Sequence, residues 1–336
     1  MTHVDMLKAL AMLLVVMGHV FYFCTYNETG FDDELIFNVI CTFHVPLFWF
    51  LSGFVVYEAP SMRKSMRKSW SFLRPMLVVG LANALLIGKV SDFFLSGGHN
   101  GYWYLLALAI FYLVMPVFRV TSNLLINKKG YTFLADVLLA IAVWMAFKVL
   151  VHLPEPILSV FTIYSCYIFW PFFIIGFLVR KYELHQLLTD SHSLAKGLFL
   201  AAAYVLTLTA CYDRLQTLEG LTSVVVEGLI ALLAIAALFA LFYQLRDNQS
   251  AVSRQLLFVG RHTLHIYIFH YFFIRFISTP FLQGPQMNVL LKLAIVTAIA
   301  VAVVYASILL GWLYDRTIQW LKKKCVKQRL IRTLCG

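Results

Sequence analysis

Ten long apolar stretches follow one another along the chain, separated by short polar segments. A lipid hydrocarbon core about 30 Å thick is crossed by a helix of roughly 20 apolar residues. Because a backbone inside lipid must satisfy its own hydrogen bonds, stretches of this length predict helices. The pattern therefore predicts an all-α polytopic membrane protein with about ten transmembrane helices. The stretches are Met6–Cys24, Leu35–Tyr57, Phe72–Lys89, Tyr102–Phe118, Tyr131–Leu150, Phe161–Val179, Leu194–Tyr212, Leu221–Tyr243, Leu256–Thr279 and Met287–Leu313.

The composition excludes the main soluble classes. Of the 336 residues, 61% are hydrophobic and only 13% are charged, whereas soluble domains carry about 25% charged residues. Too few charges remain to cover a water-facing surface, which excludes a soluble enzyme and a disordered protein.

The basic residues alternate between loops in a way that predicts the topology. They gather after the second stretch, at Arg63, Lys64, Arg67 and Lys68, and again in a basic tail over about 314–336. Since loops rich in Lys and Arg stay in the cytoplasm, we expect both termini there. The net charge of +11 then reflects topology, and no nucleic-acid partner is expected. We expect one integral-membrane domain over 1–336, in a bacterial inner membrane; the sequence predicts no oligomeric state.

The first stretch carries the most informative polar residues. Lys8 and His19 are eleven positions apart, close to three helical turns, so both lie on one helix face about 16 Å apart. Asp5 lies one turn before Lys8. An imidazole inside a membrane can act as a general base for a hydroxyl group. The alternative is a histidine that only hydrogen-bonds between helices, with Lys8 as a charge anchor.

The second stretch adds another intramembrane histidine. His44 precedes Pro46, which loosens backbone hydrogen bonding, and the small pair Ser52–Gly53 permits close helix packing. Both a chemical and a structural role are open for His44.

The basic segment between the second and third stretches suggests an anion site. Arg67 follows Arg63 by four residues, and Arg74–Pro75 enters the third stretch, where an arginine can bind a phosphate through paired hydrogen bonds. Anchoring of the chain at the cytoplasmic face explains the same residues, most simply for Arg63, Lys64 and Lys68.

Two further segments offer binding residues. The ninth stretch contains His262, His265 and His270, but their spacing is not that of a zinc site, and no metal is expected. His270 suits either a hydrogen bond in the core or a role in the site. Trp103 lies near the outer interface, as an aromatic belt residue or as a surface on which a sugar ring stacks.

Together and in this order, these features resemble the membrane-bound acyltransferase family 3, which O-acylates sugars and other envelope molecules. The family signature is a basic residue, ten intervening residues and a histidine in the first helix, as at Lys8 and His19. Asp5 and Gly18 make this segment similar to the branch of fucose 4-O-acetylase-like proteins. Phe43–Phe54 is similar to that branch's F-H-x-P-L-F-F-x-x-S-G-F element, with Trp49 in place of the second aromatic residue of its central pair.

The remaining likeness is weaker and extends over the rest of the chain. Arg74–Pro75, Trp103–Leu105 and the segment from Gly260 to His270 fall where the family has related motifs.

The resemblance implies an O-acyltransferase that moves an acyl group, most simply acetyl, from acyl-CoA on the cytoplasmic side to a hydroxyl of a carbohydrate or glycan. It implies roles for eight residues: His19 as base and His44 as oxyanion donor, Lys8, Arg67 and Arg74 for the phosphates of acetyl-CoA, and Asp5, Trp103 and His270 for the acceptor. Direct transfer and an acyl-histidine intermediate both remain open. The alternative function is an exporter of a polysaccharide or lipid-linked sugar, although we find no repeated halves.

Overall fold

Every regular element that the structure describes is a helix. The computed structural model describes residues 1–25, 35–56, 61–129, 132–215, 220–277, 279 and 288–335, and nine helices in this part are long and apolar enough to cross a membrane. The predicted all-α, polytopic membrane class is therefore confirmed. The longer helices are α1 (Thr2–Val20), α2 (Leu35–Val56), α3 (Met62–Pro75), α6 (Trp103–Lys129), α7 (Thr132–Leu150), α9 (Ile163–Lys181), α10 (Ser193–Leu215), α11 (Gly220–Tyr243), α12 (Ala251–Arg261), α13 (Thr263–Ile274) and α14 (Val289–Cys335).

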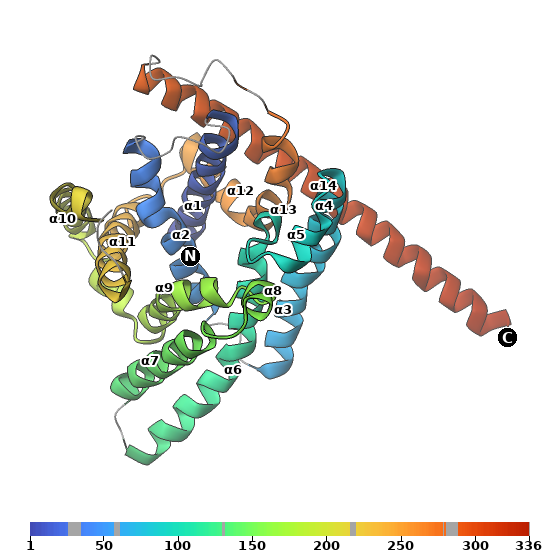
Figure 1. Cartoon of the computed structure of the whole chain (residues 1–336), viewed down its shortest axis with the longest axis horizontal. Coiled ribbons are helices and arrows are strands. Elements are labelled where there is room, and N and C mark those ends of the chain that lie inside the picture. The colour runs from blue at the N-terminus through green and yellow to red at the C-terminus, as the bar shows by residue number, and fades with distance from the viewer. Residues whose placement is uncertain are drawn as a thin grey trace.

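Helices α1 and α2 lie in the middle of the bundle, and the later helices surround them (Figure 1). Helices α2 and α9 cross at very short distance, because each contributes a glycine to the crossing. A Cβ atom on Gly53 would lie 1.7 Å from the carbonyl oxygen of Phe173, and one on Gly176 would lie 2.0 Å from that of Phe50. The close packing predicted at Ser52–Gly53 is thus confirmed.

The predicted span Leu256–Thr279 is not one helix, and this expectation was wrong. The helical path breaks at His262 (φ −110°, ψ 16°), between α12 and α13. Helix α12 packs against α1, where a Cβ atom on Gly260 would lie 1.9 Å from the carbonyl oxygen of Asp5. Helix α13 packs mainly against α14. Because each half of the stretch packs most closely against a different neighbour, hydropathy alone could not reveal the break.

The third membrane-crossing segment begins ten residues earlier than predicted. Helix α3 starts at Met62, capped by the Ser61 hydroxyl, and continues through a wider turn at Met76–Gly80 into α4 (Leu81–Leu86). Ser69 donates a hydrogen bond of 2.9 Å to the carbonyl of Ala109 in α6. The basic residues of this segment therefore lie on a packed helix and not in a loop.

A buried polar network connects α7 with α6 and with the end of α9. Asp136 of α7 is fully buried, accepts hydrogen bonds from Ser122 and Tyr182, and pairs with Lys181. This network explains how α7 can carry a carboxylate inside the membrane.

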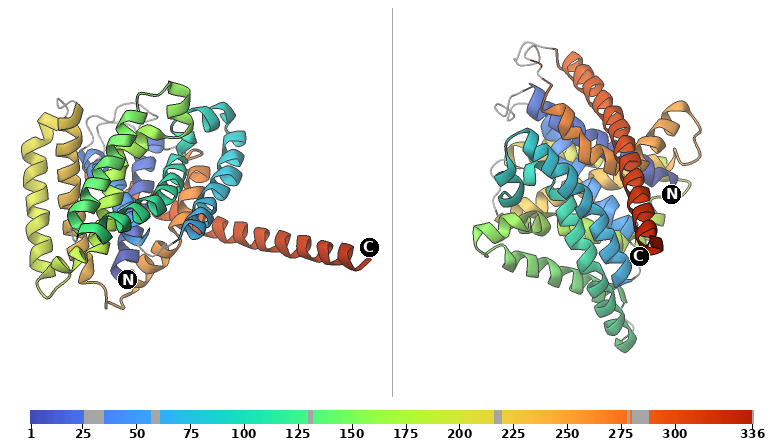
Figure 2. Two further views of the ribbon diagram at one scale, coloured as in Figure 1. Left: turned by 90° about the horizontal axis from the view of Figure 1, so that it is seen from below. Right: turned by 90° about the vertical axis from the view of Figure 1, so that its right-hand side faces the viewer.

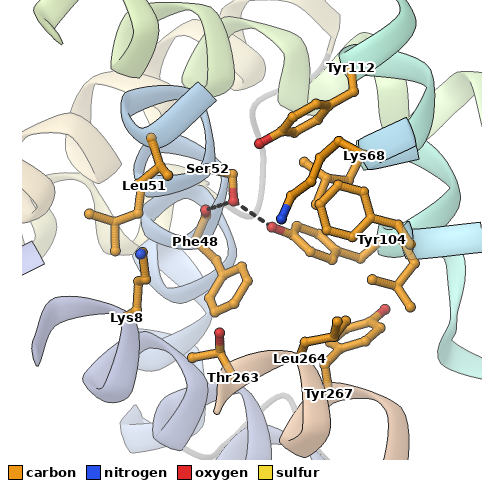
Figure 3. A pocket seen from close by; sticks show the side chains of 14 residues that line it. Lys8, Phe48, Leu51, Ser52, Lys68, Tyr104, Tyr112, Thr263, Leu264 and Tyr267 are labelled. Carbon is orange, nitrogen blue, oxygen red and sulfur yellow. Dashed lines mark hydrogen bonds between the residues drawn. The ribbon is translucent and has the colours of Figure 1, made fainter. Parts of the chain in front are cut away.

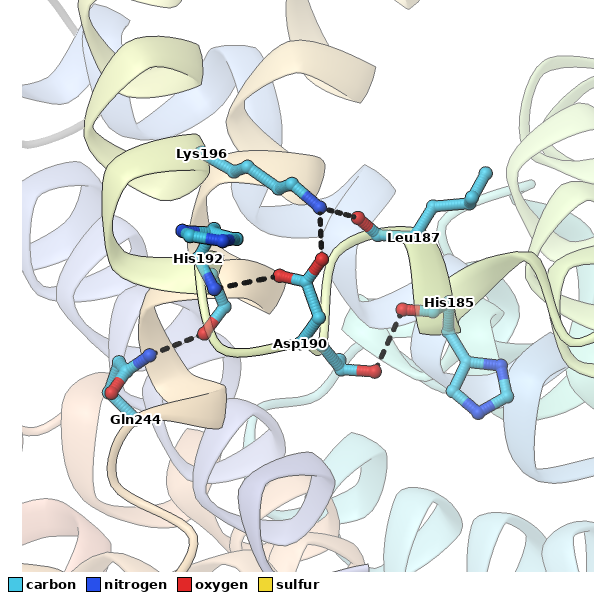
Figure 4. Close-up of polar contacts among 8 residues, drawn as sticks. His185, Leu187, Asp190, His192, Lys196 and Gln244 are labelled. Carbon is cyan, nitrogen blue, oxygen red and sulfur yellow. Dashed lines mark hydrogen bonds and ion pairs between the residues drawn. The ribbon is translucent and has the colours of Figure 1, made fainter.

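The turn between α9 and α10 has its own polar contacts (Figure 4). Lys196 donates hydrogen bonds to Asp190 at 2.5 Å and to the Leu187 carbonyl at 2.7 Å. The lysine lowers the pKa of the Asp190 carboxyl.

Helix α14 is much longer than its predicted span. It continues from the bundle to Cys335, and its C-terminal part projects away from the other helices (Figure 2). The predicted span ended at Leu313, where the apolar composition ends but the helix does not.

Candidate functional site

The site begins with a cluster of aromatic and imidazole rings at the end of α1. The Nε2 atom of His19 lies 3.0 Å from the hydroxyl oxygen of Tyr271. The ring of His270 stacks on that of His19, with centroids 5.3 Å apart and an angle of 26° between the planes. Two consecutive residues of α13 thus fix the position of the imidazole of His19, the predicted base.

Backbone hydrogen bonds determine which ring nitrogen carries the hydrogen in two neighbouring histidines. The Nδ1 atom of His44 lies 2.8 Å from the Ile40 carbonyl, and that of His270 lies 3.0 Å from the Ile266 carbonyl. A carbonyl can only accept, so each Nδ1 carries the hydrogen, and the Nε2 of each neutral ring is left as an acceptor. The predicted role of His44 as an oxyanion donor would therefore require its protonated form.

A short loop before α6 positions Tyr271. Gly101 has a φ of +98°, and a Cβ atom there would lie 2.2 Å from Cζ of Tyr271. The Arg275 guanidinium lies 5.2 Å from the centre of the Tyr271 ring and donates a hydrogen bond of 3.1 Å to the Asn100 carbonyl. The absence of a side chain at Gly101 is what allows the tyrosine to reach His19.

A small cavity lies between α1, α2, α3, α6 and α13 (Figure 3). Its volume is about 210 Å³, and Lys8 and Lys68 enter it from opposite sides. Ser52 and Tyr104 form a hydrogen bond of 2.6 Å in its wall. Lys8 also pairs with Asp5 at 3.0 Å, whereas no described carboxylate forms an ion pair with Lys68. Two ammonium groups and one carboxylate give this cavity an excess of positive charge. We name it the lysine cavity.

A larger cavity of about 660 Å³ lies between α2, α9 and α11. Thr42 and His44 of α2 line it, with Ser223 and Glu227 of α11 opposite. A hydrogen bond joins the last two side chains. We name it the glutamate cavity, since Glu227 is the only acidic residue among the described residues that line it.

The two cavities are related through the histidine cluster. On α2, Ser52 lines the lysine cavity, and His44, eight residues earlier, lines the glutamate cavity, about 12 Å away along the helix. Nε2 of His44 lies 3.9 Å from the place of a Cβ atom on Gly18, the residue before His19. On α13, Tyr267 lines the lysine cavity, one turn before His270 and Tyr271. The histidine cluster therefore lies between the lysine cavity and the glutamate cavity.

The structure does not bring all predicted site residues to these cavities. Arg67 is exposed and Arg74 is half-buried, and neither belongs to the described residues that line either cavity. Trp103 stacks on Phe169 with ring centroids 5.4 Å apart and likewise lines neither. Asp5 does not line the lysine cavity and is linked to it only by its ion pair with Lys8. Lys8 lines the lysine cavity and His44 the glutamate cavity, whereas His19 and His270 stack on each other and are not among the described residues that line either cavity.

Sequence reasoning missed three residues of this arrangement. Tyr271 follows His270 directly, but nothing in the sequence distinguishes it from the other aromatic residues of its helix. Lys68 precedes Phe72 by four residues, and its ammonium lies 5.2 Å from the centre of that buried ring; the helical spacing was the available signal. Glu227 is an acidic residue inside an apolar stretch, which is itself a functional signal.

Fold and site together define an integral membrane protein with a histidine cluster between two cavities of different charge. Residues 2–312 match the family model of acyltransferase family 3, described as an acyltransferase domain. The chain therefore belongs to this family, which confirms the predicted resemblance at the level of the family and makes the protein a membrane acyltransferase. None of the curated proteins and none of the solved structures matches the chain.

Proposed function

We propose that this protein transfers an acetyl group from acetyl-CoA to a hydroxyl of a sugar or cell-envelope glycan, with His19 as the general base. The observation that carries the proposal is the position of His19, which stacks on His270, contacts Tyr271 and follows Gly18, against which His44 packs. The family membership supplies acyl transfer as the reaction class.

The lysine cavity is suited to the donor. The phosphates of acetyl-CoA are strongly anionic, and Lys8 and Lys68 provide two ammonium groups in a partly enclosed space, where charge interactions are stronger than in water. The extended thiol arm of the donor would then follow α1 and α13 toward His19. Arg67 and Arg74 lie on the same segment as Lys68 and remain candidates for phosphates outside the cavity.

The chemical step needs a general base for the acceptor hydroxyl and a hydrogen-bond donor for the oxyanion. His19 accepts the proton of the acceptor hydroxyl while its oxygen attacks the thioester carbonyl, and the C–S bond breaks as the ester forms. The imidazolium then returns the proton to the CoA thiolate. Tyr271, 3.0 Å from Nε2 of His19, holds the ring before the acceptor binds and offers an O–H donor for the developing oxyanion.

The test is acetyl-CoA consumption by the purified protein in nanodiscs, followed as released thiol, with sugar acceptors. His19→Ala is expected to lower turnover by about 10³-fold, within the range for a lost general base. His192→Ala, an exposed histidine outside the cluster, is the matched control and should keep wild-type turnover. Wild-type protein that neither binds nor consumes any acyl-CoA would contradict the proposal and favour an exporter.

A further inference from the structure

The glutamate cavity has a chemistry unlike that of the lysine cavity. Its volume of about 660 Å³ falls within the range of small-molecule sites, which are usually 300–1,000 Å³. Hydrogen-bonding side chains project from two sides of it, with Thr42 and His44 on α2 and Ser223 and Glu227 on α11. Aromatic rings of α9, among them Tyr164 and Phe169, complete the wall.

Glu227 is the informative member of this set. It is exposed and lies near the beginning of the membrane-crossing part of α11, Thr222–Tyr243, where an ionisable group marks a functional position. Its described partner is the Ser223 hydroxyl one turn earlier, and no described lysine or arginine forms an ion pair with it. An ionised carboxylate can only accept hydrogen bonds, so its natural ligand is a group rich in O–H donors.

The same carboxylate limits which ligands can enter. A carboxylate or phosphate on the ligand would lie near Glu227 without a described cation to compensate, and like charges at short distance repel each other. The cavity therefore favours a group that is rich in hydroxyls and carries no negative charge.

We infer that the glutamate cavity binds the acceptor, and that the acceptor's bound part is a neutral carbohydrate recognised through Glu227 and Ser223. This inference rests on the proposed acetyl transfer. The geometry supports it at the other end of the cavity, because His44 lies against Gly18, next to His19. A sugar held by one pair of hydroxyls at Glu227 would direct another hydroxyl toward the base.

The decisive experiment compares two acceptor probes in nanodiscs, octyl β-glucoside and the anionic octyl β-glucuronide, at saturating acetyl-CoA. Wild-type protein is expected to acetylate the neutral probe in preference to the anionic one. Glu227→Gln should raise KM for octyl glucoside by about tenfold, since a hydrogen bond to a charged group is lost, and should weaken the preference against the glucuronide. The KM for acetyl-CoA should not change.

The chain offers a matched control. Glu155 and Ser159 form a Glu–Ser pair with the same four-residue spacing in the reverse order, with a hydrogen bond of 2.8 Å, on the exposed helix α8 (Glu155–Val160). Glu155→Gln is expected to leave both KM values unchanged. A second variant, Gly228→Leu, fills the cavity without a backbone clash, because a Cβ there would meet only Cζ of Phe172, at 3.9 Å. It should abolish acetylation of octyl glucoside while acetyl-CoA binding persists.

The outcomes separate the inference from the proposed function. If an active enzyme acetylates neither glycoside, or if Glu227→Gln behaves as wild type with both, the inference is wrong although acetyl transfer stands. If the wild-type protein neither binds nor consumes acyl-CoA, the proposed function fails first.

Discussion

The lysine cavity and the glutamate cavity differ in size, charge and position, although α2 contributes to both. The first, of about 210 Å³, contains two lysines, and the second, of about 660 Å³, contains a carboxylate and hydroxyl groups. A single binding site for one substrate would not need this opposition. The difference indicates two substrates of opposite electrostatic preference, which approach the same histidine cluster from different sides.

Changes at the histidine cluster and the loop that positions it should have the largest effect on the rate of acyl transfer. Gly101→Ala would place a methyl group 2.2 Å from Cζ of Tyr271 and force the tyrosine away from His19. A displacement of about 1 Å can cost about 10²-fold in rate, so we expect a fall of that size in kcat with little change in either KM, measured by steady-state thiol release.

Tyr271→Phe is the companion of that variant. It keeps the ring in place and removes only the hydroxyl proposed as the oxyanion donor, so kcat should fall by at least about 10²-fold. If Gly101→Ala retained wild-type kcat, the loop would not position the cluster and the two cavities would not share one reaction centre.

A smaller effect is expected from the charge of the lysine cavity. Lys68→Gln should raise KM for acetyl-CoA by about tenfold through the loss of a charge-assisted contact, with no change in KM for octyl glucoside. The KM of the wild type for acetyl-CoA should also rise with salt.

Lys64→Gln and Arg67→Gln are the matched variants on the same helix, because all three side chains are exposed and only Lys68 lies among the described residues of the cavity wall. Equal effects at all three positions would mean that the donor binds to the surface of α3 and not in the cavity.

The smallest effect should come from a polar contact remote from both cavities. Because Lys196 lowers the pKa of Asp190, the carboxylate stabilises the fold above its ordinary pKa, and this contribution disappears as the pH falls through the lowered pKa. Asp190→Asn should therefore lower the thermal midpoint slightly at pH 7 and not at strongly acidic pH, as measured by differential scanning fluorimetry. A change in either KM would show that the α9–α10 turn is coupled to the cavities.

Much of the fold followed from hydropathy, because a bilayer imposes a length and a helical conformation on each crossing segment. The error at Leu256–Thr279 has the same origin. Hydropathy reports where a segment lies but not whether it continues straight, and the break at His262 depends on which neighbours α12 and α13 pack against.

The candidate site was predictable where spacing on one helix was enough. Lys8 and His19 share a face of α1 by helical period alone, and His44 stood out as an intramembrane histidine. The choice between Arg67 and Lys68 was not predictable, since adjacent residues on a helix point in directions about 100° apart and only the packing of α3 decides which one faces the cavity.

The sequence by itself determined the membrane class, the family signature at Lys8 and His19, and the set of ionisable residues that the membrane makes costly. Only the tertiary structure decided which of them meet. The contact of His19 with Tyr271 joins residues 252 positions apart, and the glutamate cavity forms from three helices. Such long-range contacts depend on how helix faces pack, as at Gly101 and Gly260, where a missing side chain permits close approach. Local periodicity describes each helix separately and contains no information about its neighbours.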